Sequence, residues 1–242
     1  MNTQKSGRIL VWDLPVRLFH WLLVLSFAGA WLTAESERYR DFHVMLGYSL
    51  LGLIAFRLVW GFLGTRYARF SEFVRSPLAA ARYMKSLISG KAEHYTGHNP
   101  AGAIAIVLLL LLGIASGISG WMTYNEMGGE WVEEGHELFS NLMLAVVGIH
   151  VIGVIAGSLA HRENLVRAMV TGYKQGNPSQ AILKPRIIPA VLLGLGVAGF
   201  WGLWFNGKIN IDAPGELASQ QTSELADAGQ HGRKGRHHDD DD

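Results

Sequence analysis

EEGHELFSNLMLAVVGIHVIG, residues Glu133 to Gly153, is apolar for most of its length yet holds two histidines, His136 and His150. The two are fourteen residues apart. On an α-helix, this spacing returns to within about 40° of the starting direction and rises about 21 Å. The sequence therefore predicts one long apolar helix that carries two imidazoles on a single face at two depths.

The rest of the chain shows the same concentration of apolar residues. It has 242 residues, of which 49% are hydrophobic, and its mean hydropathy is +0.18. A bilayer core about 30 Å thick needs roughly 20 apolar residues in a helix. Five blocks approach this length, namely Leu18–Ala34, Phe42–Phe62, Ala101–Met122, Leu138–Ala160 and Ile187–Phe205. We predict an all-α integral membrane protein with five transmembrane helices.

The first block also resembles a secretory signal, because basic residues precede an apolar run that ends in small residues. His20 and Trp21 interrupt that run, however, and four further apolar blocks follow it. We therefore expect the first helix to be retained in the mature protein.

Cysteine is absent from the sequence. Disulfides, thiolate-bound iron–sulfur clusters and the covalent attachment of c-type haem are excluded for that reason. Any redox cofactor must be held without covalent links to sulfur.

Basic residues alternate between the connecting segments. Lys and Arg number 3 in residues 1–17, 7 in residues 57–100 and 5 in residues 161–186. The other two connections hold only Arg38 and Arg40 between them, and the second of these is acidic. Positive charge on short loops stays cytoplasmic. We predict a multi-pass membrane protein with a cytoplasmic N-terminus and a C-terminus on the outer side.

Two local patterns organise the long inner connection. Residues Ser76 to Gly90 mix Arg82 and Lys85 with apolar side chains, which predicts an amphipathic helix on the membrane surface. Asn99 suits a helix N-cap and Pro100 a first helical position, so the third transmembrane helix is expected to start there.

The polar tail, residues 207–242, follows the fifth transmembrane helix at 187–206. It ends in HGRKGRHHDDDD, a composition that favours disorder. An alternative is that its histidines and aspartates bind a metal or a basic partner.

Four histidines lie within the predicted spans, where ionisable side chains are costly and usually functional. The alternating directions of the helices place His20 and His150 near the inner surface. They place His43 and His136 at outer ends. The sequence thus predicts an inner pair and an outer pair.

Paired imidazoles that face each other across a bundle suit the axial ligation of haem iron. Gly47 follows His43 by one turn and offers the close approach that a flat ring needs. Arg17 and Arg57 are expected to pair with haem propionates. The alternative is that the histidines are hydrogen-bonded core or interfacial residues and that the arginines only extend to the interface.

Three further histidines lie near the inner surface, namely His94, His98 and His161. We expect mainly interfacial polar roles for them. A second hypothesis is that one of them donates a hydrogen bond to a quinone carbonyl.

The combined motifs resemble those of the prokaryotic cytochrome b561 family, which includes the b-type cytochrome subunits of nickel-iron hydrogenases. The resemblance covers residues 11–174 and rests on RLFHW, HVMLGY, GHNPAG, the histidine pair of the fourth helix, and HRENLVRAM. It implies a four-helix bundle that binds two non-covalent b haems. Their axial ligands correspond to His20, His43, His136 and His150. The fifth helix and the charged tail depart from the shortest members of the family.

The resemblance implies a membrane electron carrier of a respiratory chain in the bacterial inner membrane, with its C-terminus in the periplasm. Iron with two histidine ligands has no open position for a substrate. We expect electron transfer between the quinone pool and a periplasmic redox protein such as a c-type cytochrome. Alternatives are the membrane anchor of a hydrogenase or dehydrogenase, a quinone-dependent superoxide oxidase, and, in another class, a metal transporter. Expected partners are quinone, membrane lipid and a redox protein, with no nucleic acid.

Overall fold

Five long helices form the frame of the molecule. The computed structural model describes residues 7–90 and 93–209. Within these residues, five helices are long and apolar enough to cross a membrane. They are α1 Leu14–Thr33, α2 Arg40–Leu63, α5 Pro100–Tyr124, α6 Glu130–His161 and α8 Ile187–Phe205. The prediction of a helical membrane protein with five spans is confirmed.

Side chains at the helix starts fix several of these boundaries. The Asp13 carboxylate accepts a hydrogen bond of 2.9 Å from the Val16 backbone at the start of α1. The Asn99 side chain accepts one of 2.7 Å from Gly102, and Pro100 is the first residue of α5. Each cap satisfies a backbone N–H that has no partner within its helix. The predicted start of the third span is confirmed.

The amphipathic segment of the inner connection is also helical. It forms α4, Pro77–Ile88, which begins after the cap residue Ser76 and packs on α5. Tyr83 of α4 is buried, whereas Leu78 and Ile88 are 66% and 83% exposed. One apolar face thus packs on the protein while other apolar side chains remain on the surface.

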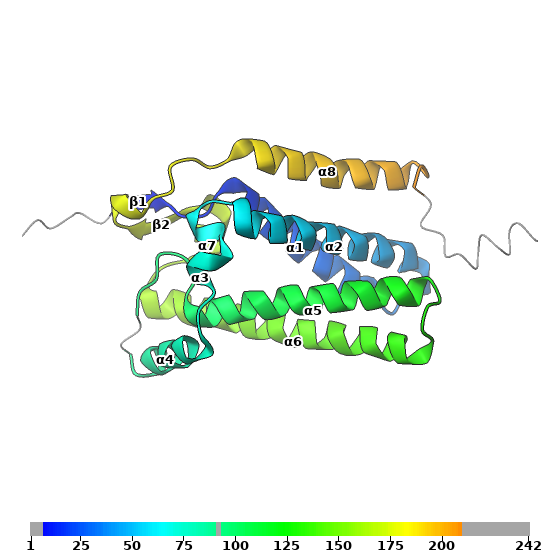
Figure 1. Cartoon of the computed structure of the whole chain (residues 1–242), viewed down its shortest axis with the longest axis horizontal. Coiled ribbons are helices and arrows are strands. Elements are labelled where there is room, and N and C mark those ends of the chain that lie inside the picture. The colour runs from blue at the N-terminus through cyan, green and yellow to red at the C-terminus, as the bar shows by residue number, and fades with distance from the viewer. Residues whose placement is uncertain (1–6, 91–92, 210–242) are drawn as a thin grey trace, which may run out of the picture.

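The long helices form two antiparallel hairpins. The short helix η1, Glu37–Tyr39, joins α1 to α2, and residues 125–129 join α5 to α6. The hairpins meet where α2 packs on α5, and α8 lies against α1 and α2 (Figure 1). Buried Leu50, Ile54, Leu110 and Met143 form the apolar core between α2, α5 and α6.

A small sheet adds a feature that the all-α prediction lacked. β1, Gly7–Leu10, pairs with β2, Tyr173–Gly176, in an antiparallel register from Gly7↔Gly176 to Leu10↔Tyr173. Strands of four residues give too short a pattern to be recognised in the sequence. The pairing ties the start of the chain to the segment that follows the fourth span.

The remaining short elements gather at one end of the bundle with the sheet and α4 (Figure 1). They are η2 Arg66–Ala68, α3 Phe70–Phe73, α7 Leu165–Thr171 and η3 Pro178–Gln180. A second apolar core that includes Val11, Trp12 and Tyr67 holds this end together. We call it the capped end. It contains the basic connections that the charge pattern predicts to be cytoplasmic.

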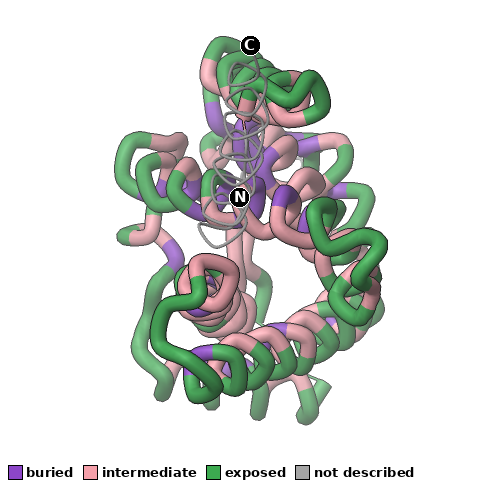
Figure 2. The backbone as a smooth tube through the Cα atoms, turned by 90° about the vertical axis from the view of Figure 1, so that its right-hand side faces the viewer, coloured by how far each residue is buried: buried purple, intermediate pink, exposed green. Residues whose placement is uncertain are grey.

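The outward faces of the spans are exposed and apolar. Leu25, Ile152 and Leu192 are 64%, 67% and 64% exposed, and Figure 2 shows exposed residues along the outer faces of the helices. Such surfaces require lipid in place of water. The predicted tail from residue 210 onward, with its histidines and aspartates, lies outside the described residues.

Candidate functional site

The outer histidines come together because α2 and α6 both begin at the end opposite the capped end. His43 lies in the first turn of α2, and His136 lies in the second turn of α6. Their ring centroids are 6.1 Å apart and their planes are nearly perpendicular, at 88°. The structure therefore brings together the two residues of the expected outer pair.

Each of these rings is oriented by a neighbouring helix. His43 Nδ1 lies 2.8 Å from the carbonyl oxygen of Ala30 on α1, and His136 Nδ1 lies 2.8 Å from that of Ser116 on α5. A carbonyl oxygen only accepts, so Nδ1 donates in both cases. In a neutral imidazole this leaves the Nε2 lone pair free to bind a metal.

The separation of the rings fits a single metal atom between them. Two imidazoles that bind from opposite sides, each at about 2.0 Å as in zinc sites, have ring centres roughly 6 Å apart. Among the described residues, no group of three or more His, Cys, Asp or Glu side chains could hold a bare ion. Two histidines suffice only if a macrocycle supplies the remaining ligands, as the porphyrin of haem does.

Small residues make room around the outer pair. A Cβ at Gly120 of α5 would lie 2.8 Å from Cε1 of His136, so the ring occupies space that only glycine leaves. A Cβ at Gly47 would meet no atom within 4 Å, so the face of α2 one turn from His43 is open. Sequence reasoning identified Gly47 but missed Gly120 and Ser116. The only sequence signal for these two was the run of small residues SGISG in α5.

The inner histidines, His20 of α1 and His150 of α6, are both partly buried. They lie close enough to interact electrostatically. The His20 ring packs edge-on against Trp21 with 5.1 Å between centroids. Its Nδ1 is buried and has no hydrogen-bond partner. A buried polar atom without a partner is costly, so this nitrogen marks a place where a bound group would complete the site.

The two arginines of the expected inner site also have unpartnered nitrogens. Arg57 is only 3% exposed, and its guanidinium lies 4.8 Å from the Phe70 ring and 5.7 Å from the Phe73 ring. One of its terminal nitrogens is buried with no hydrogen-bond partner. Arg17 donates to the Val170 carbonyl, but its Nε is likewise buried and unpartnered. Buried cationic donors of this kind suit an anionic ligand.

The His98 side chain is held among aromatic rings. Its ring lies between those of Trp12 and Phe73, with centroids 4.5 Å and 4.6 Å away. Burial, followed by the positive charges of Arg57 and Lys174, lowers the pKa of His98 to about 3. The imidazole is therefore neutral at neutral pH, and its Nδ1 is buried without a partner.

His94 and His161 form a separate pair at the capped end. Their ring centroids are 5.2 Å apart in an edge-to-face arrangement, and the Tyr83 hydroxyl lies 3.3 Å from His161 Nε2. This pair is thus positioned by α4 and the end of α6, close to the predicted inner surface.

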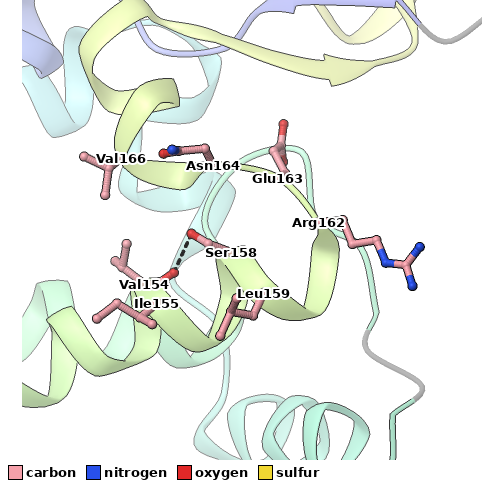
Figure 3. A pocket seen from close by; sticks show the side chains of 8 residues that line it. All are labelled: Val154, Ile155, Ser158, Leu159, Arg162, Glu163, Asn164 and Val166. Carbon is pink, nitrogen blue, oxygen red and sulfur yellow. Dashed lines mark hydrogen bonds between the residues drawn. The ribbon is translucent and has the colours of Figure 1, made fainter.

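A groove of about 330 Å³ lies at the end of α6 and the start of α7 (Figure 3). Its apolar wall begins at Val154, one turn after His150, and its polar end includes Glu163 and Asn164. Ser158 turns its hydroxyl back onto the Val154 carbonyl, and Arg162 extends away from the other lining residues (Figure 3). The groove is therefore mainly an apolar surface with polar groups at one end.

Comparisons with known proteins agree with this geometry. The family model described as prokaryotic cytochrome b561 matches residues 11–172. A "Probable Ni/Fe-hydrogenase B-type cytochrome subunit" of Azotobacter chroococcum is 25% identical over 72% of this chain and 91% of its own length. The "Probable Ni/Fe-hydrogenase 1 B-type cytochrome subunit" of Escherichia coli K12 is 22% identical over 71% of this chain and 94% of its own length. No solved structure matches the chain significantly.

The family model covers more than half of the chain and includes all four histidines of the inner and outer pairs. The chain belongs to the prokaryotic cytochrome b561 family and is a membrane b-type cytochrome, a class of protein that carries haem b.

Proposed function

We propose that the protein binds two b haems and transfers electrons across the bilayer between the quinone pool and a redox enzyme at the outer surface. The observation that best supports this proposal is the outer pair. The ring centroids of His43 and His136 are 6.1 Å apart, and both Nδ1 atoms are hydrogen-bonded to backbone carbonyls. His20 and His150 are proposed as the inner ligands. When bound, haem supplies one-electron iron chemistry.

The residues of the chain determine what this chemistry is used for. Histidines on both sides of the iron leave no position for a substrate, which favours electron transfer over oxygen chemistry. The pairs are about 21 Å apart along α6 by helical rise. Such a separation places one site toward each surface of the membrane.

The names of the relatives favour a hydrogenase-like enzyme as the redox partner over a soluble c-type cytochrome. Both relatives described above are named as hydrogenase cytochrome subunits, and the alignments cover most of their length. We therefore propose that the protein serves as the membrane electron carrier of such an enzyme. The proposed contact surface is the turn before α6 and the first two turns of that helix, which carry the exposed glutamates Glu126, Glu130, Glu133, Glu134 and Glu137.

The quinone is proposed to react at the inner surface. The groove beside α6 starts one turn from His150, and the His94 and His161 pair lies near the same end. An apolar groove with a few polar groups suits a quinone ring and its tail.

Haem stoichiometry tests the proposal. Purified protein should contain close to two b haems per chain in a pyridine hemochrome assay and should show the spectrum of low-spin haem. His136→Ala should remove one haem and leave the other, and His20→Ala should do the same for the inner site. A colourless protein would favour the metal transporter, and one haem per chain would overturn the two-haem proposal.

A further inference from the structure

A cluster of cationic and polar side chains lies beside the proposed inner haem ligands. It is formed by Arg57 from α2 and His98 from the segment before α5. Both residues contact the Phe73 ring, at 5.7 Å for the guanidinium and 4.6 Å for the imidazole. His98 also lies within electrostatic reach of His20 and His150. We call this the Arg57–His98 cluster.

Among the described residues, no acceptor is bonded to two of the buried nitrogens of the Arg57–His98 cluster. A terminal nitrogen of Arg57 and Nδ1 of His98 are both buried without hydrogen-bond partners. Asp13 is the carboxylate whose charge acts on Arg57. Its oxygens are already bonded to the Val16 backbone, to Trp60 Nε1 at 3.1 Å and to Thr65 Oγ1 at 2.7 Å. Two adjacent buried donors without acceptors call for an anionic ligand with two oxygens.

The sequence around His98 fixes the imidazole in this position. A Cβ at Gly97 would lie 2.7 Å from the Tyr67 ring, so glycine allows the segment to approach η2 closely. Asn99, which follows His98, caps α5. Trp12 and Phe73 enclose the ring from two directions. The imidazole is therefore packed between two aromatic rings that come from distant parts of the sequence.

We propose that His98 is a positioning residue for the inner haem. Nδ1 of His98 would donate a hydrogen bond to a haem propionate, and Arg57 would donate an ionic hydrogen bond to the same carboxylate. The inference rests on the proposed function, because it requires a haem between His20 and His150. A neutral imidazole has one donor to give, and a guanidinium provides the charge. Together they offset the negative charge of a carboxylate in a low-dielectric site, which favours the reduced form of the iron.

Redox titration with spectral resolution of the two haems tests the proposal on the full-length protein in detergent. His98→Leu should shift the midpoint potential of the inner haem to more negative values and leave that of the outer haem unchanged. The infrared redox difference bands of haem labelled with ¹³C in the propionates should shift as well. His98→Asn, whose amide nitrogen is placed near the position of Nδ1, should restore both signals. Ser71, an exposed neutral residue of α3, provides the control, and Ser71→Leu should change neither signal.

Several results separate this inference from the proposed function. Two haems in the His98→Leu protein with unchanged potentials and unchanged propionate bands would overturn it. Lost quinol oxidation with unchanged bands would also overturn it, because His98 would then serve the quinone. If the leucine variant does not fold, His98→Gln takes its place. The amide of glutamine lies away from the position of Nδ1, so the midpoint potential of the inner haem and the propionate bands should shift as for leucine. The proposed function fails independently, through the haem content of the wild type.

Discussion

The two imidazoles of the outer pair have fixed orientations. Neighbouring helices hold His43 and His136 by their Nδ1 atoms, through the carbonyls of Ala30 and Ser116. Gly120 also helps to fix the His136 ring, because it leaves the space that this ring fills. The orientation of each proposed haem ligand is therefore set by residues outside the pair.

Gly47 offers a test at this scale. A side chain at residue 47 meets no protein atom within 4 Å of its Cβ, so the protein alone has room for one. We expect Gly47→Leu to fold but to lose most of the outer haem, because the side chain would enter the space of the ring. Gly52, exposed on the same helix and equally free of neighbours, is the control. Absorption spectra should show one haem in Gly47→Leu and two in Gly52→Leu; equal haem content in both variants would contradict the assignment.

At the scale of elements, one buried carboxylate connects the start of α1 to the end of α2. Asp13 is fully buried, caps α1, and accepts hydrogen bonds from Trp60 and Thr65. The two helices are therefore joined at the capped end by polar contacts as well as by apolar packing. A buried donor left without its acceptor costs about 1–3 kcal/mol.

Asp13→Ala is expected to lower stability markedly, because three donors lose their acceptor and α1 loses its cap. The cap alone contributes about 1 kcal/mol. Asp41→Ala, in an exposed residue near the start of α2, should have little effect. Thermal unfolding followed by circular dichroism in detergent should show a lower midpoint for Asp13→Ala only. A similar midpoint for both variants would show that the buried network contributes little.

At the scale of the whole molecule, the ends of the bundle differ in charge and in structure. The capped end contains the sheet, α3, α4 and α7 (Figure 1). At the opposite end, short connections join α1 to α2 and α5 to α6. The connections at the capped end are the basic ones. Positive charge on short connections retains them in the cytoplasm.

Reporter fusions test this orientation. Alkaline phosphatase, which is active only in the periplasm, should be inactive when fused after Gly90 and active when fused after Gly129. Green fluorescent protein, which becomes fluorescent only when it remains in the cytoplasm, should give the opposite pattern at the same two residues. The reverse result with both reporters would place the capped end outside and exchange the surfaces assigned to the quinone and to the enzyme.

The sequence alone determined the features that depend on short stretches of chain. Hydropathy predicted five spans, local cap residues predicted the start of α5, and helical periodicity placed His136 and His150 on one face. These features follow from contacts between near neighbours and from burial in lipid, so a local pattern is enough to indicate them.

Only the tertiary structure decided the features that join distant segments. It paired β1 with β2, enclosed His98 between Trp12 and Phe73, and fitted the His136 ring against Gly120. The residues in each of these contacts lie on different segments of the chain, and their partners are chosen by the packing of helices around them. Side-chain orientation and burial result from that packing, which no stretch of the chain specifies by itself.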